Sequence, residues 1–433
     1  MSRAYLFCLL LTLIPGAATA APLETDKLLE HYRYLHQNPE LSRQEANTSA
    51  YLARQLEAMG YSVTREVGGH GLVAILANGA GPTVMYRADM DALPIAEATG
   101  LPFASTVTAT NPAGESVPVM HACGHDMHMT VMLGTASRMA GQRDAWRGRL
   151  VLVAQPAEEV GGGAKAMLAD GLFQRFPVPD YNLAMHVGSG LPAGKFGYVS
   201  GYAMANVDSV DITIYGRGGH GAYPHQTVDP VVMAASIVTQ LQTIVSRELP
   251  PRETAVVTVG SIHGGTKHNI IPDEVTLQLT VRSYADATRN LLLRRIREIS
   301  EGVARTAGMP EERLPAVAVK DEYTPAVYNT PALVDKVVPV LQARFGEDAV
   351  VTGQPSMAGE DFGRYGRTPE NIPTFLIQLG ASDPAAVAAA QAGGPALPGL
   401  HSAQFAPAAR PTIESGVTGM TVILLSLMPA AGS

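Results

Sequence analysis

The stretch from residue 207 to residue 320 restricts the possible folds most, because its structural signals follow a known order. Residues 207–215 alternate apolar and polar side chains, as a strand with one buried face does. The signals that follow are helix, strand, strand, helix and short strand, at residues 230–247, 254–262, 274–283, 286–307 and 316–320. This β-α-β-β-α-β order predicts a compact ferredoxin-like unit.

Helix and strand signals also alternate on both sides of this unit, which predicts a layered α/β sheet. Helices are expected within residues 22–62, with a break at Asn38-Pro39. The other expected strands are 71–77, 82–87, 149–155, 181–186 and 374–379, and the other expected helices are 130–140, 164–170, 332–344 and 414–427.

The chain has 433 residues, which are too many for one ordinary domain. We therefore expect a two-domain α/β protein in which residues 203–321 are inserted into a larger domain of residues 21–202 and 322–433. Residues 383–398 are rich in Ala, Gly and Pro and predict a surface loop.

The first twenty residues have the pattern of a secretory leader. Arg3 supplies a positive start, residues 4–14 are mostly apolar, and Ala18-Thr19-Ala20 offers a small-residue cleavage site. The apolar run is shorter than the roughly 20 residues that span a bilayer. We expect cleavage near Ala20 and a secreted or periplasmic protein without a membrane anchor, with an uncleaved anchor as the alternative.

Charge and cysteine content exclude some classes of function. The chain has 31 Lys and Arg against 39 Asp and Glu, and without Arg3 the balance becomes 30 − 39 = −9. An acidic chain argues against a nucleic-acid partner. Cys8 lies in the leader, so the mature chain keeps only Cys123 and can form no internal disulfide. A lone thiol in an oxidising compartment must be buried, paired with another chain or bound to a ligand.

The run from Met120 to His128 is the densest group of metal-ligand side chains in the sequence. In Cys123-Gly124-His125 the glycine lets the backbone turn tightly, so that a thiolate and an imidazole can converge on one cation. A buried thiol beside a surface histidine is the alternative. Three further candidate ligands crowd the same nine residues, namely His121, Asp126 and His128.

Pairs of acidic residues follow two of the expected strands. Asp89 and Asp91 occupy alternate positions after the strand that ends at Arg87, so both carboxylates could face one site, although a solvated turn would have the same pattern. Glu158 and Glu159 follow the strand 149–155. One of them could ligate a metal while the other takes a proton from water.

Two more histidines complete a possible ligand set. His186 ends the strand 181–186 and His401 lies in a loop, although alone each would be unremarkable. Ligands bind at the carboxyl ends of strands in an open α/β sheet. Five candidates exceed one tetrahedral site and favour a paired site with a bridging ligand; they are Cys123, His125, Glu159, His186 and His401.

Nine segments carry a resemblance to a known family; they are residues 36–42, 86–95, 120–128, 155–159, 185–186, 219–225, 268–272, 358–362 and 400–402. In this order they resemble the metallo-aminoacylase and carboxypeptidase superfamily. The chain is most similar to its amidohydrolase branch, which includes hippurate hydrolases and plant auxin-conjugate hydrolases.

The resemblance implies a role for each matching residue. The five candidates above match the ligands of two metal ions, with Cys123 bridging, and Glu158 matches the general base. Asp91 matches a residue that orients the ligands. The inserted unit matches a lid and dimerisation domain, in which His220 helps to hold the oxyanion, often across a dimer, and Asn269 lies near the substrate. A structural role remains the alternative for these two lid residues.

The resemblance implies hydrolysis of the amide bond of N-acyl amino acids or related small amides, by a homodimer or larger homo-oligomer. Two divalent ions per subunit are expected, zinc or manganese first, with cobalt or nickel also suited to this ligand set. A carboxypeptidase or dipeptidase acting on short peptides is one alternative. A metal-dependent binding protein is another, but it would not need Glu158 beside Glu159.

Overall fold

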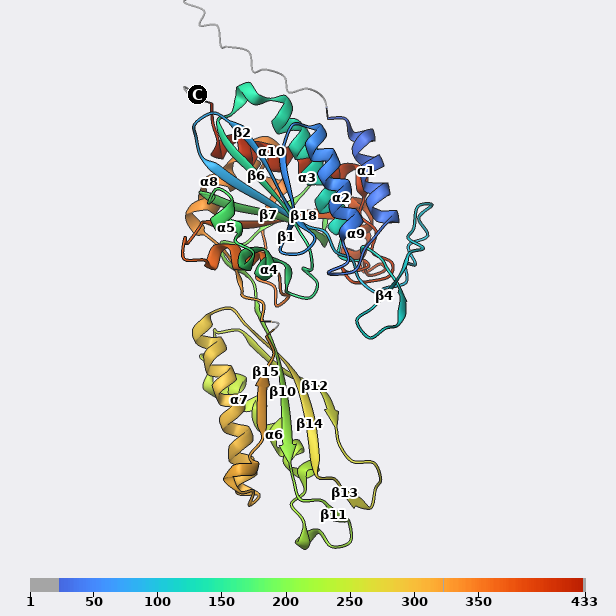
Figure 1. Cartoon of the computed structure of the whole chain (residues 1–433), viewed down its shortest axis with the longest axis vertical. Coiled ribbons are helices and arrows are strands. Elements are labelled where there is room, and N and C mark those ends of the chain that lie inside the picture. The colour runs from blue at the N-terminus through green and yellow to red at the C-terminus, as the bar shows by residue number, and fades with distance from the viewer. Residues whose placement is uncertain (1–22, 322, 431–433) are drawn as a thin grey trace, which may run out of the picture.

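The computed structural model describes residues 23–321 and 323–430, which form a large α/β domain and a smaller domain that projects from it (Figure 1). The expected leader lies outside the described residues. No helix within the described ranges has the length and apolar character needed to cross a membrane.

A mixed sheet of eight strands forms the centre of the large domain. In spatial order the strands are β1 (Ser62–Val67), β2 (Gly71–Asn78), β6 (Gly148–Gln155), β3 (Thr83–Asp89), β7 (Tyr181–Pro192), β18 (Thr374–Ser382), β8 (Phe196–Tyr198) and β17 (Val350–Thr352). The neighbours β6, β3, β7 and β18 are parallel, and these central strands are largely buried. Their carboxyl ends therefore open on one edge, where ligands bind in such sheets.

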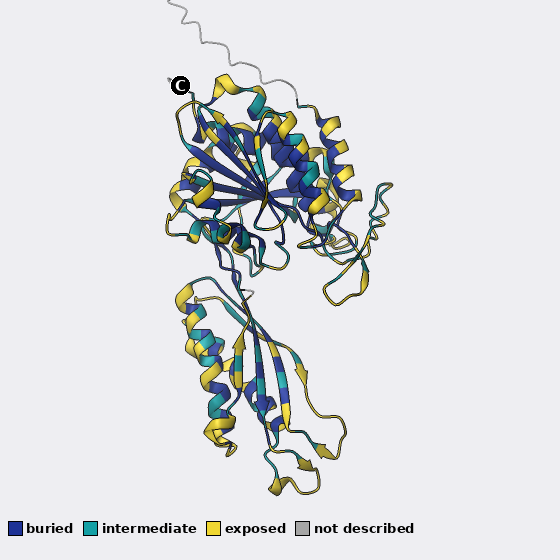
Figure 2. Cartoon of the chain, viewed as in Figure 1, coloured by how far each residue is buried: buried dark blue, intermediate teal, exposed yellow. Residues whose placement is uncertain are grey.

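Helices cover both faces of this sheet, so the central strands are buried on both sides (Figure 2). The larger apolar core includes α1 (Thr25–Gln37), α2 (Ala46–Ala58), α3 (His125–Gly141), α8 (Pro331–Phe345) and α10 (Ala409–Leu427). The opposite core includes α4 (Gly163–Ala169), α5 (Leu172–Arg175) and the 3-10 helix η6 (Asp361–Arg367).

The small domain has the predicted ferredoxin-like order. Its elements are β10 (Asn206–Tyr215), α6 (Pro230–Thr243), β12 (Ala255–His263), β14 (Glu274–Ser283), α7 (Asp286–Thr306) and β15 (Ala316–Val319). The strands lie in the order β12-β14-β10-β15, and every pair is antiparallel. Alternate residues of β10 and β14 are buried against α6 and α7, so one face of this sheet carries the core. The division at 202/203 and 321/322 remains a prediction.

The chain passes between the two domains at two neighbouring points. It leaves through β9 (Gly201–Met204) and returns into β16 (Val327–Asn329), and these two strands pair antiparallel. The buried Asn206 ties the two passages together, because its Oδ1 accepts hydrogen bonds from the Tyr323 hydroxyl and the Ala326 amide at 2.9 and 2.8 Å. The Asn206 side chain therefore links the start of the small domain to the segment that returns to the large one.

Three expectations about local structure are wrong. Helix α3 begins at His125, five residues before the expected start, because Gly124 takes a left-handed conformation (φ 82°) that turns the chain into the helix. Strand β7 continues to Pro192, so His186 lies within it instead of at its end. Within 383–398 the chain forms α9 (Pro384–Gln391), whose first amides donate to the Asp383 side chain.

Candidate metal centre

The loop before α3 brings Cys123 and His125 to the carboxyl edge of the sheet. Gly124 is required between them, because a Cβ atom there would lie 2.5 Å from Cγ2 of Val187. The Nδ1 atom of His125 lies 2.8 Å from the carbonyl oxygen of Asp91 and must donate to it. Nε2 of His125 is buried and has no hydrogen-bond partner among the described residues, and Oδ2 of Asp89 lies 3.6 Å from it. Burial lowers the pKa of His125, but the charges of Asp89 and Cys123 outweigh burial and raise it above its ordinary value.

Glu159 joins these two residues from the turn after β6. Its Oε1 lies 3.8 Å from Nε2 of His125 and, like that nitrogen, is buried without a partner among the described residues. The ligand atoms of Cys123, His125 and Glu159 all lie within 4.8 Å of one another. Burial raises the pKa of Glu159 to about 7, opposed by His125 and increased by Asp91 and Asp89. A buried atom left unpaired is costly, so a cation suits this group.

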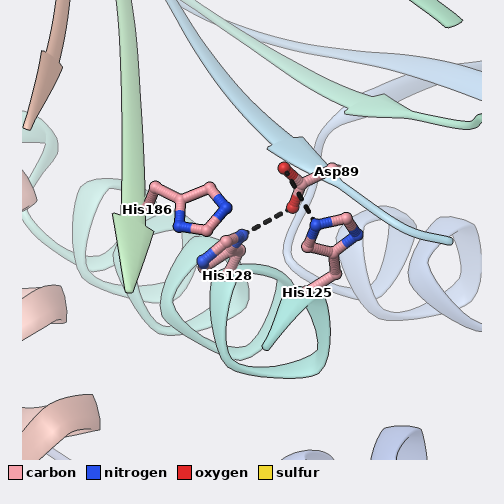
Figure 3. Close-up of side chains that lie close together, drawn as sticks. All are labelled: Asp89, His125, His128 and His186. Atoms are coloured by element: carbon pink, nitrogen blue, oxygen red, sulfur yellow. Dashed lines mark hydrogen bonds and ion pairs between the residues drawn. The ribbon is translucent and has the colours of Figure 1, made fainter. Parts of the chain in front are cut away.

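His186 faces the same place from β7 (Figure 3). Its Nδ1 donates to the carbonyl oxygen of Val187 at 2.8 Å, so its Nε2 can accept the hydrogen bond of the Cys123 thiol, whose Sγ lies 3.6 Å away. Its ring also lies close to those of His125 and His128. The structure therefore brings together four of the five predicted ligands, and the ligand nitrogen of His186 contacts the sulfur of Cys123, which is another of the four.

His401 lies at the exposed side of this group. Its backbone N–H donates to the carbonyl oxygen of Ala122, and its φ of 63° holds it in the left-handed region. Nε2 of His401 lies 3.4 Å from Oε2 of Glu159, and its side chain is 53% exposed. The fifth predicted ligand thus contacts the group through Glu159, on the side that opens to solvent.

Asp91 contacts both His125 and Glu159, as expected of a residue that orients them. One carboxylate oxygen accepts hydrogen bonds from the Ser42 hydroxyl at 2.6 Å and from the Glu159 amide at 3.0 Å. The other lies 3.3 Å from Nδ1 of His125. The contacts keep the Asp91 pKa below its ordinary value, although its burial acts in the opposite direction.

His128, to which the resemblance assigned no role, supports the same centre. His128 accepts the amide of Val187 at Nε2 (2.9 Å) and therefore donates from Nδ1 to Asp89 (2.6 Å; Figure 3). Both of its ring nitrogens are used, and burial lowers its pKa to about 4, so it is neutral. It is a brace between β3 and β7, and the spacing of histidines in the sequence could not distinguish it from a ligand.

Glu158 is half-buried, and its carboxylate lies next to those of two buried residues, Glu360 and Asp361. Burial raises the pKa of Glu158 well above its ordinary value, and the charges of Glu360 and Asp361 raise it further. The buried Arg87 guanidinium lies 2.7 Å from Asp89, 2.9 Å from Glu360 and 3.2 Å from Asp361, and so balances part of this negative charge. Arg87 and Glu360 were not expected to take part.

These side chains open on a cavity of about 690 Å³ between the two domains. Cys123, Glu158, Glu159, His186 and His401 line its inner wall. Other parts of the wall come from β7, β18 and the domain crossings, and from the small domain through Val207 and Arg282. The cavity is of a size that holds a small organic molecule.

The two predicted lid residues lie far from this cavity. His220 is in β11 (Gly219–His220) and Asn269 precedes β13 (Ile270–Ile271), at the end of the small domain far from the large one (Figure 1). Both are exposed, and Nδ1 of His220 accepts the Ala222 amide. Within one chain the structure does not bring them to the cavity.

Comparison with known proteins agrees with this geometry. Residues 85–392 match Peptidase family M20/M25/M40. The chain is 39% identical to a hippurate hydrolase of Campylobacter jejuni, over 76% of this chain and 82% of that protein. It is 36% identical to thermostable carboxypeptidase 2 of Saccharolobus solfataricus, over 78% of this chain and 83% of that protein.

Solved structures give the same result. A protein described as an aminohydrolase from methicillin-resistant Staphylococcus aureus superposes with a TM-score of 0.81 at 34% identity, over 94% of this chain and 97% of that one. A dinuclear metal binding peptidase of the M20 family from Bacillus subtilis has a TM-score of 0.75 at 28% identity, over 93% and 98%. With more than half of its length matched, this chain belongs to Peptidase family M20/M25/M40.

Proposed function

We propose that the chain hydrolyses the amide bond of small N-acyl amino acids at the cavity between its two domains. Its family and its relatives make it a metal-dependent amide hydrolase, and the relatives include a hippurate hydrolase and an N-acetyl-L-cysteine deacetylase. The observation that carries the proposal is the half-buried Glu158 in the same cavity wall as Cys123 and Glu159, in a group where His125 and Glu159 each keep an unpaired ligand atom.

The residues proposed to hold a pair of divalent ions are Cys123, His125, Glu159, His186 and His401. Thiolate, imidazole and carboxylate together suit zinc or manganese, with cobalt or nickel as alternatives. Bound ions polarise a substrate carbonyl and lower the pKa of water. Asp91 keeps His125 and Glu159 in position through its contacts with both.

Glu158 is the proposed general base. It takes the proton of the attacking water and passes it to the nitrogen of the leaving amine. Its position in the cavity wall and its raised pKa both support this role, because a carboxyl with a raised pKa can give the proton back.

Arg282 supports the proposal that the substrate carries a carboxylate. It lies in β14, lines the cavity, and is half-buried; its guanidinium donates to Thr280 and to the carbonyl oxygen of Met357. Burial lowers the pKa of Arg282, which indicates a cation short of solvation. A substrate carboxylate would compensate the charge of Arg282 through a charge-assisted hydrogen bond.

A carboxypeptidase or dipeptidase activity on short peptides is the second candidate. Arg282 favours it too, because a peptide also ends in a carboxylate. A panel of N-acyl amino acids, their methyl esters and dipeptides, with the product identified by mass spectrometry, separates the two. Turnover of N-acyl amino acids above dipeptides supports the first candidate. No turnover on any member would overturn both.

We also propose a homodimer in which the partner's His220 and the partner's Asn269 reach this cavity. The positions of both residues at the far end of the small domain support this, together with the unpaired edge of β12 in the small sheet. An exposed Ile262 and Ile270 near that end add apolar surface.

Mixing two inactive variants tests this arrangement. H220A and E158Q dimers are dissociated and reassociated together, so that half of the dimers are mixed. If the site is shared, one site of each mixed dimer has both wild-type residues, and activity returns. Two inactive variants that stay inactive after verified exchange would contradict the shared site.

The leader supports a location outside the cytoplasm. We propose cleavage near Ala20 and a periplasmic or secreted protein. The intact mass of the chain purified from the periplasm and from the medium gives the cleavage point. A chain found only in the cytoplasm with residues 1–20 attached would contradict the proposal.

A further inference from the structure

A second cavity lies on the large domain where the chain returns from the small one. Its volume is about 310 Å³, and it is lined by Lys165 of α4, by Tyr323 and Pro325 of the returning passage, and by Arg364 and Arg367 of η6 with the adjacent Thr368. None of these residues lines the cavity at the metal centre. Three of the lining side chains are cations.

Arg364 is the cation whose charge is least compensated. It forms no ion pair with a carboxylate among residues 23–321 and 323–430, and it donates only to the carbonyl oxygen of Tyr323. Its Nε is buried and has no hydrogen-bond partner within the described ranges. Burial lowers the pKa of Arg364, and the charges of Asp361 and Asp321, which act in the opposite direction, do not outweigh it.

The Thr368 hydroxyl is a second polar group without a hydrogen-bond partner among the described residues. Its Oγ1 is also buried. A buried donor left unpaired is costly, and a hydroxyl beside a guanidinium is a combination that binds oxyanions. The cavity therefore offers a charged donor and a neutral donor to one ligand.

The ion pairs of the other two cations are with exposed acids. Lys165 pairs with Asp321 at 2.7 Å, and the Asp321 side chain is 95% exposed. Arg367 pairs with Asp286 at 2.9 Å, and that side chain is 58% exposed. Exposed pairs contribute little to stability, so a ligand can replace these acids at small cost.

We propose that this cavity binds a small tetrahedral oxyanion, of the phosphate or sulfate class, between Arg364, Lys165 and Thr368. Arg367 adds to the positive potential, and its contact with the Tyr323 hydroxyl at 3.2 Å keeps it at the cavity. The ligand bridges α4 and η6 next to the returning passage, so it also stabilises that passage.

Isothermal titration of the metal-loaded protein with inorganic phosphate, and separately with sulfate, tests the proposal at constant ionic strength. Phosphate can also bind at the metal centre, so variants must separate the two sites. R364M and K165M should each raise the dissociation constant of the proposed site by about tenfold, which is the effect of losing one charged hydrogen bond. Binding at the metal centre should not change in either variant. R294M, at an exposed pair with Glu298, is the matched control and should bind as the wild type does.

D321N sharpens the test, because it removes the acid that competes for Lys165 and should tighten binding. A selenate soak should give an anomalous peak between Arg364 and Thr368. The proposal is overturned if R364M and K165M both bind phosphate and sulfate as R294M does, or if the anomalous peak appears only at the metal centre. K165M keeps the test valid if R364M does not fold, since Lys165 is half-exposed.

Discussion

Nε2 of His128 accepts the backbone N–H of Val187 at 2.9 Å, one residue after the proposed ligand His186. With Nδ1 of His128 bound to Asp89, the ring links β3 to β7. H128A removes this link, and we expect a loss of metal affinity of about 10–100-fold, because residues that orient ligands have effects of this size. Competition with a fluorescent chelator measures it.

The control for this prediction is H225A, at an exposed histidine of the small domain. It should leave metal affinity unchanged. If H128A also binds both ions with wild-type affinity, His128 is not a brace of the centre.

Gly124 should tolerate no side chain. G124A would place a Cβ 2.5 Å from Val187 in a residue with φ 82°, and we expect a loss of about 1–3 kcal/mol of unfolding free energy, with weaker metal binding. Urea unfolding measures the free energy. G141A, at the end of α3 with no atom within 4 Å of its added Cβ, is the matched control and should be neutral or slightly stabilising. Equal stability of the two variants would contradict the prediction.

The E158Q variant should separate binding from chemistry. Glutamine keeps the shape of Glu158 but cannot take a proton, so kcat should fall by about 10²–10⁴-fold. Metal content, measured by inductively coupled plasma mass spectrometry, should stay at the wild-type value. Near-full activity in E158Q would show that another group is the base.

His36 should make stability depend on pH. Burial lowers its pKa, but hydrogen bonds and charges of Asp126 and Glu97 outweigh burial and raise the pKa to about 9. The group is protonated in the folded protein and has a pKa near 6.5 when unfolded. Its contribution is therefore complete below pH 6.5 and disappears as the pH rises to about 9, a change of up to about 3 kcal/mol.

Unfolding free energies of the metal-loaded protein between pH 6 and 10 test this dependence. The wild type should lose stability across the window from 6.5 to 9, and H36Q should show a flatter profile there. Parallel profiles for the two proteins would mean that His36 is not the group responsible.

Removal of the ions should destabilise the large domain. A ligand present at 100 times its dissociation constant adds about 2.7 kcal/mol to the stability of the folded state. Chelation should therefore lower the thermal midpoint and abolish activity, and added Zn²⁺ or Mn²⁺ should restore both. A C123S variant whose midpoint responds to chelation as the wild type does would remove Cys123 from the ligand set.

Most of the fold could be predicted, because it depends on local periodicity. The small domain was predicted almost residue by residue, since alternate residues of β10 and β14 show the two-residue period of strands with one buried face. Three strands of the large sheet, β1, β8 and β17, were not predicted. The other errors lie where a single backbone conformation or a capping side chain determines the start of a helix. Helix α3 starts at His125 because of Gly124, and α9 forms among alanines because the Asp383 side chain caps it.

The proposed ligands were identified from the sequence, but their supports were not. Arg87 and Glu360 are 273 residues apart, and only the folded sheet brings them together. His128 resembles a ligand in the sequence, and its role as a brace depends on the amide of Val187, which no pattern reveals. The positions of His220 and Asn269 could not be inferred either, because they depend on how far the small sheet extends from the large one.

The pairing of β9 with β16 means that the polypeptide enters and leaves the small domain through adjacent strands. Cut at these points, the large domain would have two neighbouring ends that a short turn could rejoin. The small domain is therefore connected to the large one as an insertion between two adjacent strands. Recombination could replace it, and with it the residues that we propose reach a neighbouring subunit, without altering the order of the strands in the large sheet.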